Sequence, residues 1–336
     1  MEPGGTSPPA LLSDLLRDVS RSFYQTLRIL PGRIRPQVSL AYLLARTTDT
    51  VADTELLPVA ERLAVLSALR DRILGVSRES IDFGGLARQQ GSSAERVLLE
   101  NANAALGLLR GLSPEDRARV QEVLKTIMSG QELDLQRFGG ASAEHLVSLY
   151  TDVELDDYTY RVAGCVGEFW TRMCRAHLFP DAPIDEPAFL ANGVRFGKGL
   201  QLANILRDIP TDLRHGRCYL PVERLAPCGL EPADLLKPAS EPRLRPLYQA
   251  YLDRAEAHLK AGWTYTNTVP RGCVRLRLAC AWPILIGFET LKLLRAGNVL
   301  DPAHRIKIPR RQVKQIMLRS VVCYPWSRAW RNLVPQ

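Results

Sequence analysis

The sequence predicts an all-α protein, and three observations support this prediction. Apolar residues recur at three- and four-residue steps in successive segments, which is the period of a helix with one buried face. No run of alternating apolar and polar residues is bounded by the turn residues that close a hairpin. The chain has 336 residues and is 46% hydrophobic, so it can bury a large core within one helical domain.

The predicted helices follow one another with short breaks. The first covers 11–30 and ends at Pro31, because a proline followed by glycine does not continue a helix. Segment 84–95 is rich in glycine and serine and is predicted to be a loop, and 213–245 is predicted to be irregular because of its prolines and glycines. The other predicted helices lie in 38–53, 60–75, 96–112, 113–135, 155–179, 187–209, 244–266 and 274–297.

The composition of the chain favours some classes of binding partner and disfavours others. The formal net charge is +8, from 44 Lys and Arg against 36 Asp and Glu, which favours nucleic acid, acidic lipid or phosphorylated substrates. Nucleic acid is disfavoured, because no run of Lys and Arg is interleaved with aromatic residues. The seven cysteines form no CxxC pair, and no His lies at zinc spacing, which is typical of reduced cytosolic thiols.

The chain ends differ from the rest. Residues 1–10 are predicted to be a flexible lead without the features of a secretory signal, and no apolar stretch reaches the roughly 18 residues of a spanning helix. We therefore expect a cytoplasmic protein. Residues 301–336 are predicted to be a basic amphipathic segment. Two interpretations of this segment stay open: peripheral contact with the inner face of a membrane, or a last helix with its apolar face on the core and its basic face in solvent.

The stretch DTVAD places Asp49 and Asp53 at i and i+4, on one face of the predicted helix. Such pairs also arise by chance in a chain with 36 acidic residues. Here, however, the neighbouring AYLLARTTDTVA is mostly apolar or small, and two like charges on such a helix repel each other. The pair therefore predicts a bound cation.

The stretch NILRDIPTD supplies a second acidic face. Asn204, Asp208 and Asp212 stand at i, i+4 and i+8 and share a face if the helix persists, but Pro210 is expected to bend or end it. Carboxylate and amide oxygens suit Mg²⁺, which takes one or two protein carboxylates together with phosphate oxygens. Arg207 beside them suits a bidentate contact with phosphate. The two acidic faces together indicate a Mg²⁺–diphosphate site.

These motifs resemble a known family. DTVAD and NILRDIPTDL…GRCYLP resemble the two aspartate-rich motifs of squalene and phytoene synthases, which join prenyl diphosphates head to head. SRSFYQTLRILP, SGQELDL and YTYRVAGCVGEFWTRM resemble three further family segments, and all five follow the family order from about residue 20 to 225. The resemblance implies a single isoprenoid-synthase helical bundle around a central apolar cavity, here 11–300.

The resemblance also implies site residues. The Mg²⁺ ions bridging two allylic diphosphates would be bound by Asp49, Asp53, Asn204, Asp208 and Asp212. The departing pyrophosphate would be held and stabilised by Arg46, Arg207 and Arg217. The positions that contact diphosphate or line the site correspond to Ser20, Arg21, Ser22 and Tyr42, and the spacing from Val162 makes Tyr158 rather than Tyr160 the catalytic tyrosine. Two departures, Ala52 in the first motif and Pro210 in the second, put the number of metal ions in doubt.

The reaction implied by the resemblance is condensation of two farnesyl diphosphates to presqualene diphosphate, followed by reduction with NADPH to squalene. Lys307, Arg310 and Arg311, in RIKIPRRQ, would bind the NADPH phosphate; a basic surface turn is the alternative. Another alternative is a synthase of presqualene diphosphate, dehydrosqualene or phytoene that has no reductive step. Gly164 and Gly167 are expected to leave room for a prenyl chain, and we expect a monomer or a weak dimer.

Overall fold

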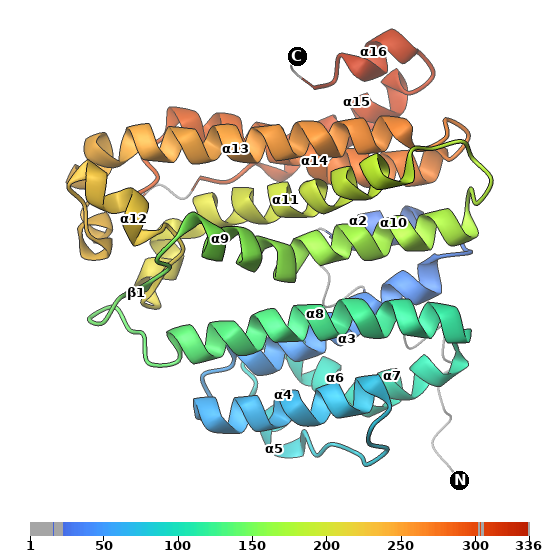
Figure 1. Cartoon of the computed structure of the whole chain (residues 1–336), viewed down its shortest axis with the longest axis horizontal. Helices are drawn as coiled ribbons and strands as arrows, with labels where there is room; N and C mark the ends of the chain where they lie inside the picture. The colour runs from blue at the N-terminus through green and yellow to red at the C-terminus, as the bar shows by residue number, and fades with distance from the viewer. Residues whose placement is uncertain (1–15, 17–22, 302, 304–305, 335–336) are drawn as a thin grey trace. The chain divides into compact units, whose positions relative to one another are not determined.

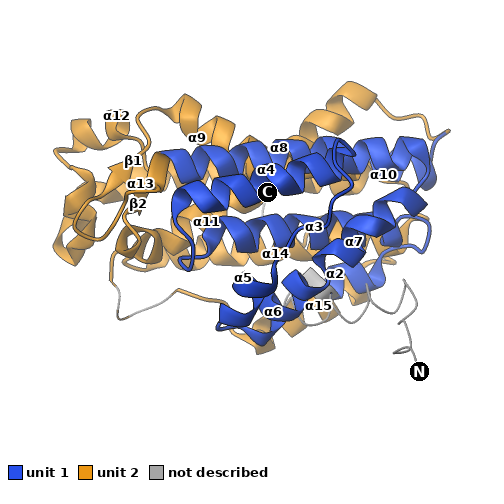
Figure 2. Ribbon diagram, turned by 90° about the horizontal axis from the view of Figure 1, so that it is seen from below, with its two compact units in different colours: residues 1–136, 172–180 blue, residues 137–171, 181–336 orange. Residues whose placement is uncertain are grey.

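The computed structural model describes residue 16 and residues 23–334, except 302 and 304–305. It is 75% helical, which confirms the all-α prediction. The chain folds into two compact units, 1–136 with 172–180 and 137–171 with 181–336 (Figure 2). No helix among the described residues is long and apolar enough to cross a membrane.

The first unit holds the helices that precede residue 137. Its described elements are α2 (Phe23–Ile29), α3 (Arg35–Asp53), α4 (Val59–Leu74), α5 (Gly84–Gln89), α6 (Ser93–Glu100), α7 (Ala102–Leu108), η1 (Leu109–Gly111) and α8 (Pro114–Phe138), whose last two residues belong to the second unit. The prediction of a loop over 84–95 is wrong. Burial of Leu86 and Ala87 outweighs the glycines of α5, and the Ser92 hydroxyl caps α6 by accepting from the Glu95 amide.

The second unit is built around long helices joined by short pieces. Its elements are β1 (Val147–Ser148), α9 (Asp152–Thr159), the π-helix η2 (Tyr160–Gly164), α10 (Cys165–His177, in this unit up to Thr171), α11 (Glu186–Arg214), β2 (Arg217–Cys218), α12 (Val222–Leu225), η3 (Ala226–Cys228), η4 (Pro232–Leu236), η5 (Pro238–Ser240), α13 (Glu241–Thr268), α14 (Val274–Ala296), α15 (Arg310–Cys323) and α16 (Ser327–Arg331). Helix α11 packs along α13, and α13 along α14 (Figure 1).

Helix α11 continues through Pro210 to Arg214, so this proline does not end the helix. Proline lacks the N–H that would donate to the carbonyl four residues earlier, that of Leu206. The buried Tyr248 hydroxyl on α13 donates to this carbonyl instead, at 3.1 Å. The hydrogen bond from α13 thus replaces the missing backbone donor and keeps the last turn of α11 helical.

Glycines bring α10 and η2 against α11. A Cβ on Gly167 would lie 1.9 Å from the Gly193 carbonyl oxygen, and one on Gly197 would lie 2.1 Å from the Ala163 oxygen. A Cβ on Gly164 would meet Val194 and Lys198 side chains at 3.3 Å. The expectation that Gly164 and Gly167 leave room for a prenyl chain is therefore wrong, because α11 already fills that space.

The Tyr248–Leu206 hydrogen bond yields the first prediction. Tyr248→Phe leaves the Leu206 carbonyl without its donor, and we expect the free energy of unfolding to fall by about 1–3 kcal/mol. In a Pro210→Ala background the backbone N–H of residue 210 can satisfy the carbonyl, so the same change should cost less than half as much. Urea unfolding of the four proteins measures this coupling, and equal losses in both backgrounds would contradict the account.

Candidate active site

The first acidic motif occupies a narrow accessible stripe on α3. Between residues 38 and 53 every side chain is buried except Tyr42, Ala45, Arg46, Asp49 and Asp53. These positions recur at three- and four-residue steps, so they line one face of the helix. Every other face of this part of α3 is buried, and the charged groups therefore have one common outlet.

Asp49 is the electrostatic centre of this stripe. Burial, and next the nearby Asp53 carboxylate, raise the pKa of Asp49 to about 6, although the Arg46 guanidinium acts in the opposite direction. Arg46 donates a hydrogen bond to the Asp49 carboxylate and lies 3.7 Å from that of Glu95. A group with a raised carboxyl pKa gains from an added cation, so the stripe favours a metal ion or a further positive charge.

The second acidic motif forms a similar stripe on α11. Asn204 is exposed and Asp208 and Asp212 are partly buried, whereas Ile205, Leu206 and Ile209 between them are buried in the core. Because the helix persists through residue 214, all three polar side chains share one face. The sequence prediction of a common face is thus confirmed for Asp212 as well.

Arg207 is bonded to the aspartate beside it. Its Nε and Nη2 donate to the two carboxylate oxygens of Asp208 at 3.0 and 2.5 Å. The pairing repeats the arrangement on α3, where Arg46 contacts Asp49. Each acidic motif thus carries its own guanidinium in direct contact with one aspartate.

Arg217 is positioned by a short parallel strand pair. Strand β2 pairs with β1 in the register Val147↔Arg217, and the Val147 amide donates to the Gly216 carbonyl at 2.8 Å. Gly216 has φ +77°, and a Cβ there would lie 2.3 Å from the Ser142 amide nitrogen, so only glycine fits this turn. The glycine directs the chain from the end of α11 into β2.

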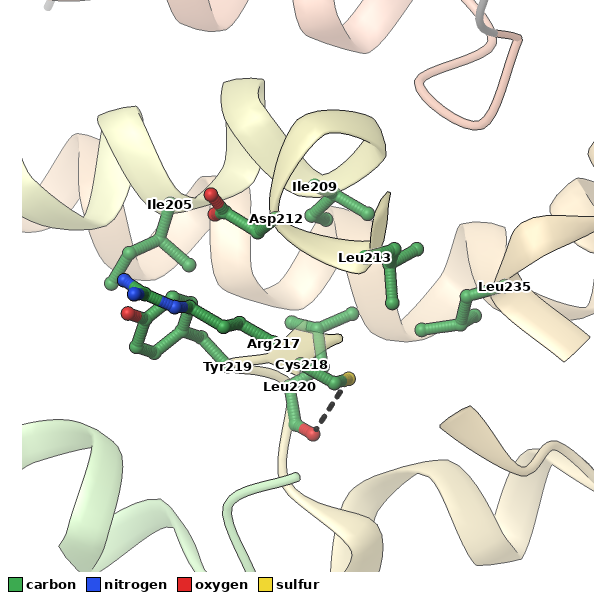
Figure 3. Close-up of a pocket in the computed structure, with 9 residues that line it drawn as sticks. All are labelled: Ile205, Ile209, Asp212, Leu213, Arg217, Cys218, Tyr219, Leu220 and Leu235. Carbon is green, nitrogen blue, oxygen red and sulfur yellow. Dashed lines mark hydrogen bonds between the residues drawn. The ribbon is translucent and has the colours of Figure 1, made fainter. Parts of the chain in front are cut away.

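Figure 3 shows a small pocket that is partly open to solvent. Asp212 and Arg217 line it together with apolar side chains, among them Ile205 and Leu235. The sequence-predicted residues Asp212 and Arg217 therefore lie in one pocket of the second unit.

Tyr158 is buried beside a tyrosine that the sequence analysis did not single out. Its ring stacks on that of Tyr219 with centroids 4.7 Å apart, and the two hydroxyls are 3.3 Å apart. Phe138 meets the Tyr219 ring edge-on at 5.3 Å. In the sequence, only its position could have marked Tyr219 as a site residue, because it stands two residues after Arg217 in the GRCYLP stretch.

The π-helix η2 begins two residues after Tyr158, in the Tyr-Arg-Val-Ala-Gly stretch. Single π turns inside α-helices often mark functional sites. Here the turn separates α9, which carries Tyr158, from α10, whose Gly167 meets α11.

The donor sets fit Mg²⁺ but form no complete cage. Among the described residues, no three His, Cys, Asp or Glu side chains converge as a ready-made metal site. Mg²⁺ usually keeps waters and takes one or two carboxylates plus substrate phosphate oxygens. The Asp49 and Asp53 carboxylates provide such a partial set, since Asp53 adds to the effect of burial on the pKa of Asp49.

The remaining predicted site residues lie elsewhere. Lys307, Arg310 and Arg311 are exposed, at and just before the start of α15, and are not part of either acidic stripe. Ser20, Arg21 and Ser22 lie outside the described residues. Tyr42 is partly buried on the α3 stripe, one turn before Arg46.

A sequence model of squalene/phytoene synthases matches residues 16–312. The chain belongs to the squalene/phytoene synthase family. It is an enzyme of this family and a prenyltransferase, whose members use prenyl diphosphate substrates. The family assignment agrees with the resemblance seen in the sequence motifs.

Two relatives and one solved structure illustrate the similarity to the family. A presqualene diphosphate synthase from Rhodopseudomonas palustris (strain ATCC BAA-98 / CGA009) is 28% identical over 314 residues, covering 90% of this chain and 93% of that protein. A bifunctional lycopene cyclase/phytoene synthase from Colletotrichum graminicola is 33% identical over 224 residues, covering 66% of this chain and 36% of that protein. TcSQS, solved with the ligand BPH1237, has a TM-score of 0.75 at 22% identity, covers 92% and 85% of the two chains, and shares the fold.

The raised pKa of Asp49 predicts a stability gain from its removal. The folded protein loses stability as the pH rises from the ordinary 3.8 through about 6, because the crowded carboxylate must ionise. Asp49→Asn should stabilise the metal-free protein above pH 6 by about 1 kcal/mol, a figure kept small because 39% of the side chain is exposed. The gain should shrink as the pH falls towards 4.

Thermal unfolding in a chelator between pH 4 and 8 measures this difference. Glu79→Gln, at an exposed position of the same unit, is the matched control and should leave the midpoint unchanged. A destabilised Asp49→Asn protein at pH 8 would show that the carboxylate is not crowded.

Proposed function

We propose that this enzyme catalyses Mg²⁺-dependent head-to-head condensation of two farnesyl diphosphates to presqualene diphosphate. One allylic diphosphate ionises, and the double bond of the other attacks the resulting carbon cation. A cyclopropane ring forms, and one pyrophosphate and one proton leave. The observation that carries the proposal is the paired arginine in each acidic stripe, Arg46 on Asp49 and Arg207 on Asp208.

The paired arginines suit a site that binds and releases diphosphate. Without ligand, the guanidinium compensates the neighbouring carboxylate. Bound Mg²⁺ supplies the charge neutralisation that makes diphosphate a leaving group. With the carboxylates engaged, Arg46 and Arg207 are available to bind phosphate oxygens in a bidentate manner. Arg217, in the pocket with Asp212, is proposed to hold the departing pyrophosphate.

The stacked rings of Tyr158 and Tyr219 are suited to stabilise the carbocation that forms in the proposed reaction. An allylic cation is quenched by water, so it needs a dry surrounding that offers electron density. Tyr158 and Tyr219 are 9% and 7% exposed, and their stacked rings offer such a surrounding. We assign Tyr158 a catalytic role on this basis, with Tyr219 holding it in place.

Reduction to squalene with NADPH is the second candidate. It is favoured by the exposed Lys307, Arg310 and Arg311, none of which forms a salt bridge within the described part of the chain. These side chains could contact the NADPH phosphate. The similarity to the presqualene diphosphate synthase from Rhodopseudomonas palustris instead supports a reaction that stops at presqualene diphosphate.

Product analysis distinguishes these functions. Purified protein is incubated with farnesyl diphosphate and Mg²⁺, with and without NADPH, and the products are identified by mass spectrometry. Presqualene diphosphate in both tubes is the expected result. Squalene formed only with NADPH would establish the reductive step as well. A dehydrogenated C30 product in both tubes would replace presqualene diphosphate as the product, and turnover of geranylgeranyl diphosphate alone would contradict the C15 assignment.

Loss of either acidic stripe should abolish turnover. We expect Asp49→Ala and Asp208→Ala each to lower kcat/KM at least about 100-fold, because each removes a carboxylate proposed to bind Mg²⁺. Asp157→Ala is the matched control, since Asp157 pairs with Arg161 on the helical surface and lies in neither stripe. Full Mg²⁺-dependent activity in either stripe variant would refute the diphosphate site.

A further inference from the structure

The positive charge of the chain is concentrated at its C-terminal end. Segment 302–336 contains eight Lys and Arg and no Asp or Glu, so it accounts for the whole formal net charge of +8. The preceding 301 residues carry equal numbers of acidic and basic side chains. Such a separation of charge favours an anionic partner at this end.

The inner side of this segment is firmly held by the second unit. Trp330 stacks on Trp263 with ring centroids 5.1 Å apart, and Ser320 accepts a hydrogen bond from the Trp282 indole at 3.0 Å. The buried Arg277 lies over the Tyr324 and Trp330 rings at 5.6 and 5.3 Å. These contacts fix which side of α15 faces outward.

The outward side combines an apolar cluster with basic neighbours. Leu318, Val321, Val322 and Trp326 are 66%, 47%, 56% and 62% exposed, and we call these four residues the α15 patch. The first three lie at i, i+3 and i+4, on one face of the last turns of α15, and Trp326 follows in the turn before α16. The flanking basic side chains that are exposed include Arg311, Lys314 and Arg319.

An anionic lipid surface matches both features of the α15 patch. Its headgroups attract Lys and Arg, and its hydrocarbon boundary accepts Leu and Val, while Trp favours the interface between them. A second copy of the chain is a poorer occupant, because two segments of eight like charges would repel each other. No salt bridge within the described part of the chain neutralises Lys314 or Arg319.

We propose that α15 and the turn after it dock this enzyme peripherally onto an anionic membrane surface, with the α15 patch at the hydrocarbon boundary. The patch is too short to span a bilayer, so the attachment is reversible. If the proposed prenyl condensation is correct, the docked enzyme would release presqualene diphosphate, whose long hydrocarbon chains are apolar, beside lipid. The docking itself does not depend on turnover, and its test uses no substrate.

Vesicle co-sedimentation tests the proposal. The full-length protein is mixed with vesicles of phosphatidylcholine alone or with about 30 mol% phosphatidylglycerol, which supplies negative surface charge. We expect binding to the anionic vesicles only, and its loss in about 0.5 M salt, where surface charges are screened. The triple variant Leu318→Ser/Val322→Ser/Trp326→Ser should bind at least about tenfold more weakly.

Two further variants distinguish the contribution of the α15 patch to vesicle binding from that of its flanking charges and from nonspecific adsorption of exposed apolar residues. Lys314→Gln/Arg319→Gln should also weaken binding, because it removes two of the flanking charges. Val153→Ser is the matched control: Val153 is 77% exposed on α9, between Asp152 and Glu154 and outside the α15 patch, and its loss should leave binding unchanged. Circular dichroism checks that each variant folds.

Three results would overturn the proposal. The first is equal vesicle binding by the triple variant and the unchanged protein. The second is equal binding to neutral and anionic vesicles. The third is a dimer, seen by sedimentation velocity without vesicles, that the triple variant abolishes, since the patch would then be covered by a second copy.

Discussion

A single hydrogen bond, from the Tyr248 hydroxyl to the Leu206 carbonyl, allows the second acidic motif to work as one surface. Without it, Pro210 would leave this carbonyl unpaired in the core and the last turn of α11 would be free to unwind. Because α11 stays helical to residue 214, Asp208 and Asp212 project from the same face. The same ordered end leads through the turn at residue 216 into β2, which holds Arg217. The geometry of the candidate site therefore depends on a tyrosine from a different helix.

Charge explains why these helices carry arginines as well as aspartates. A carboxylate on the only accessible stripe of an otherwise buried helix is costly to ionise, as the raised pKa of Asp49 shows. Arg46 reduces that cost for Asp49 by direct contact, and Arg207 makes a similar contact with Asp208. Both guanidinium groups are partly exposed. Each stripe thus pairs a carboxylate with a guanidinium, which is the charge arrangement on which the proposed Mg²⁺–diphosphate site rests. At Asp49 the raised pKa implies a loss of stability at neutral pH, a cost that is common at functional sites.

Much of this could be predicted from the sequence because the signals are local. Helical periodicity and four-residue spacing located both acidic faces, and the motif order identified the family. The parts that could not be predicted depend on long-range contacts. A proline looked like a helix end because its replacement donor, Tyr248, lies 42 residues from the carbonyl that it satisfies. Gly167 looked like space for substrate, although the Gly193 backbone of α11 occupies that space. No sequence pattern marked Tyr219 as a site residue, and only the stacking of its ring on that of Tyr158 indicates this role.

The central claim is that each acidic stripe binds diphosphate through Mg²⁺ and its paired arginine. Calorimetric titration of the purified enzyme with inorganic pyrophosphate, in Mg²⁺ and in a chelator, tests it without any assumption about the product. The account predicts heat of binding in Mg²⁺, little or none in the chelator, and at least about tenfold weaker binding in Mg²⁺ after Arg207→Gln. Pyrophosphate that binds equally well in the chelator, or equally well to the Arg207→Gln protein, would contradict it.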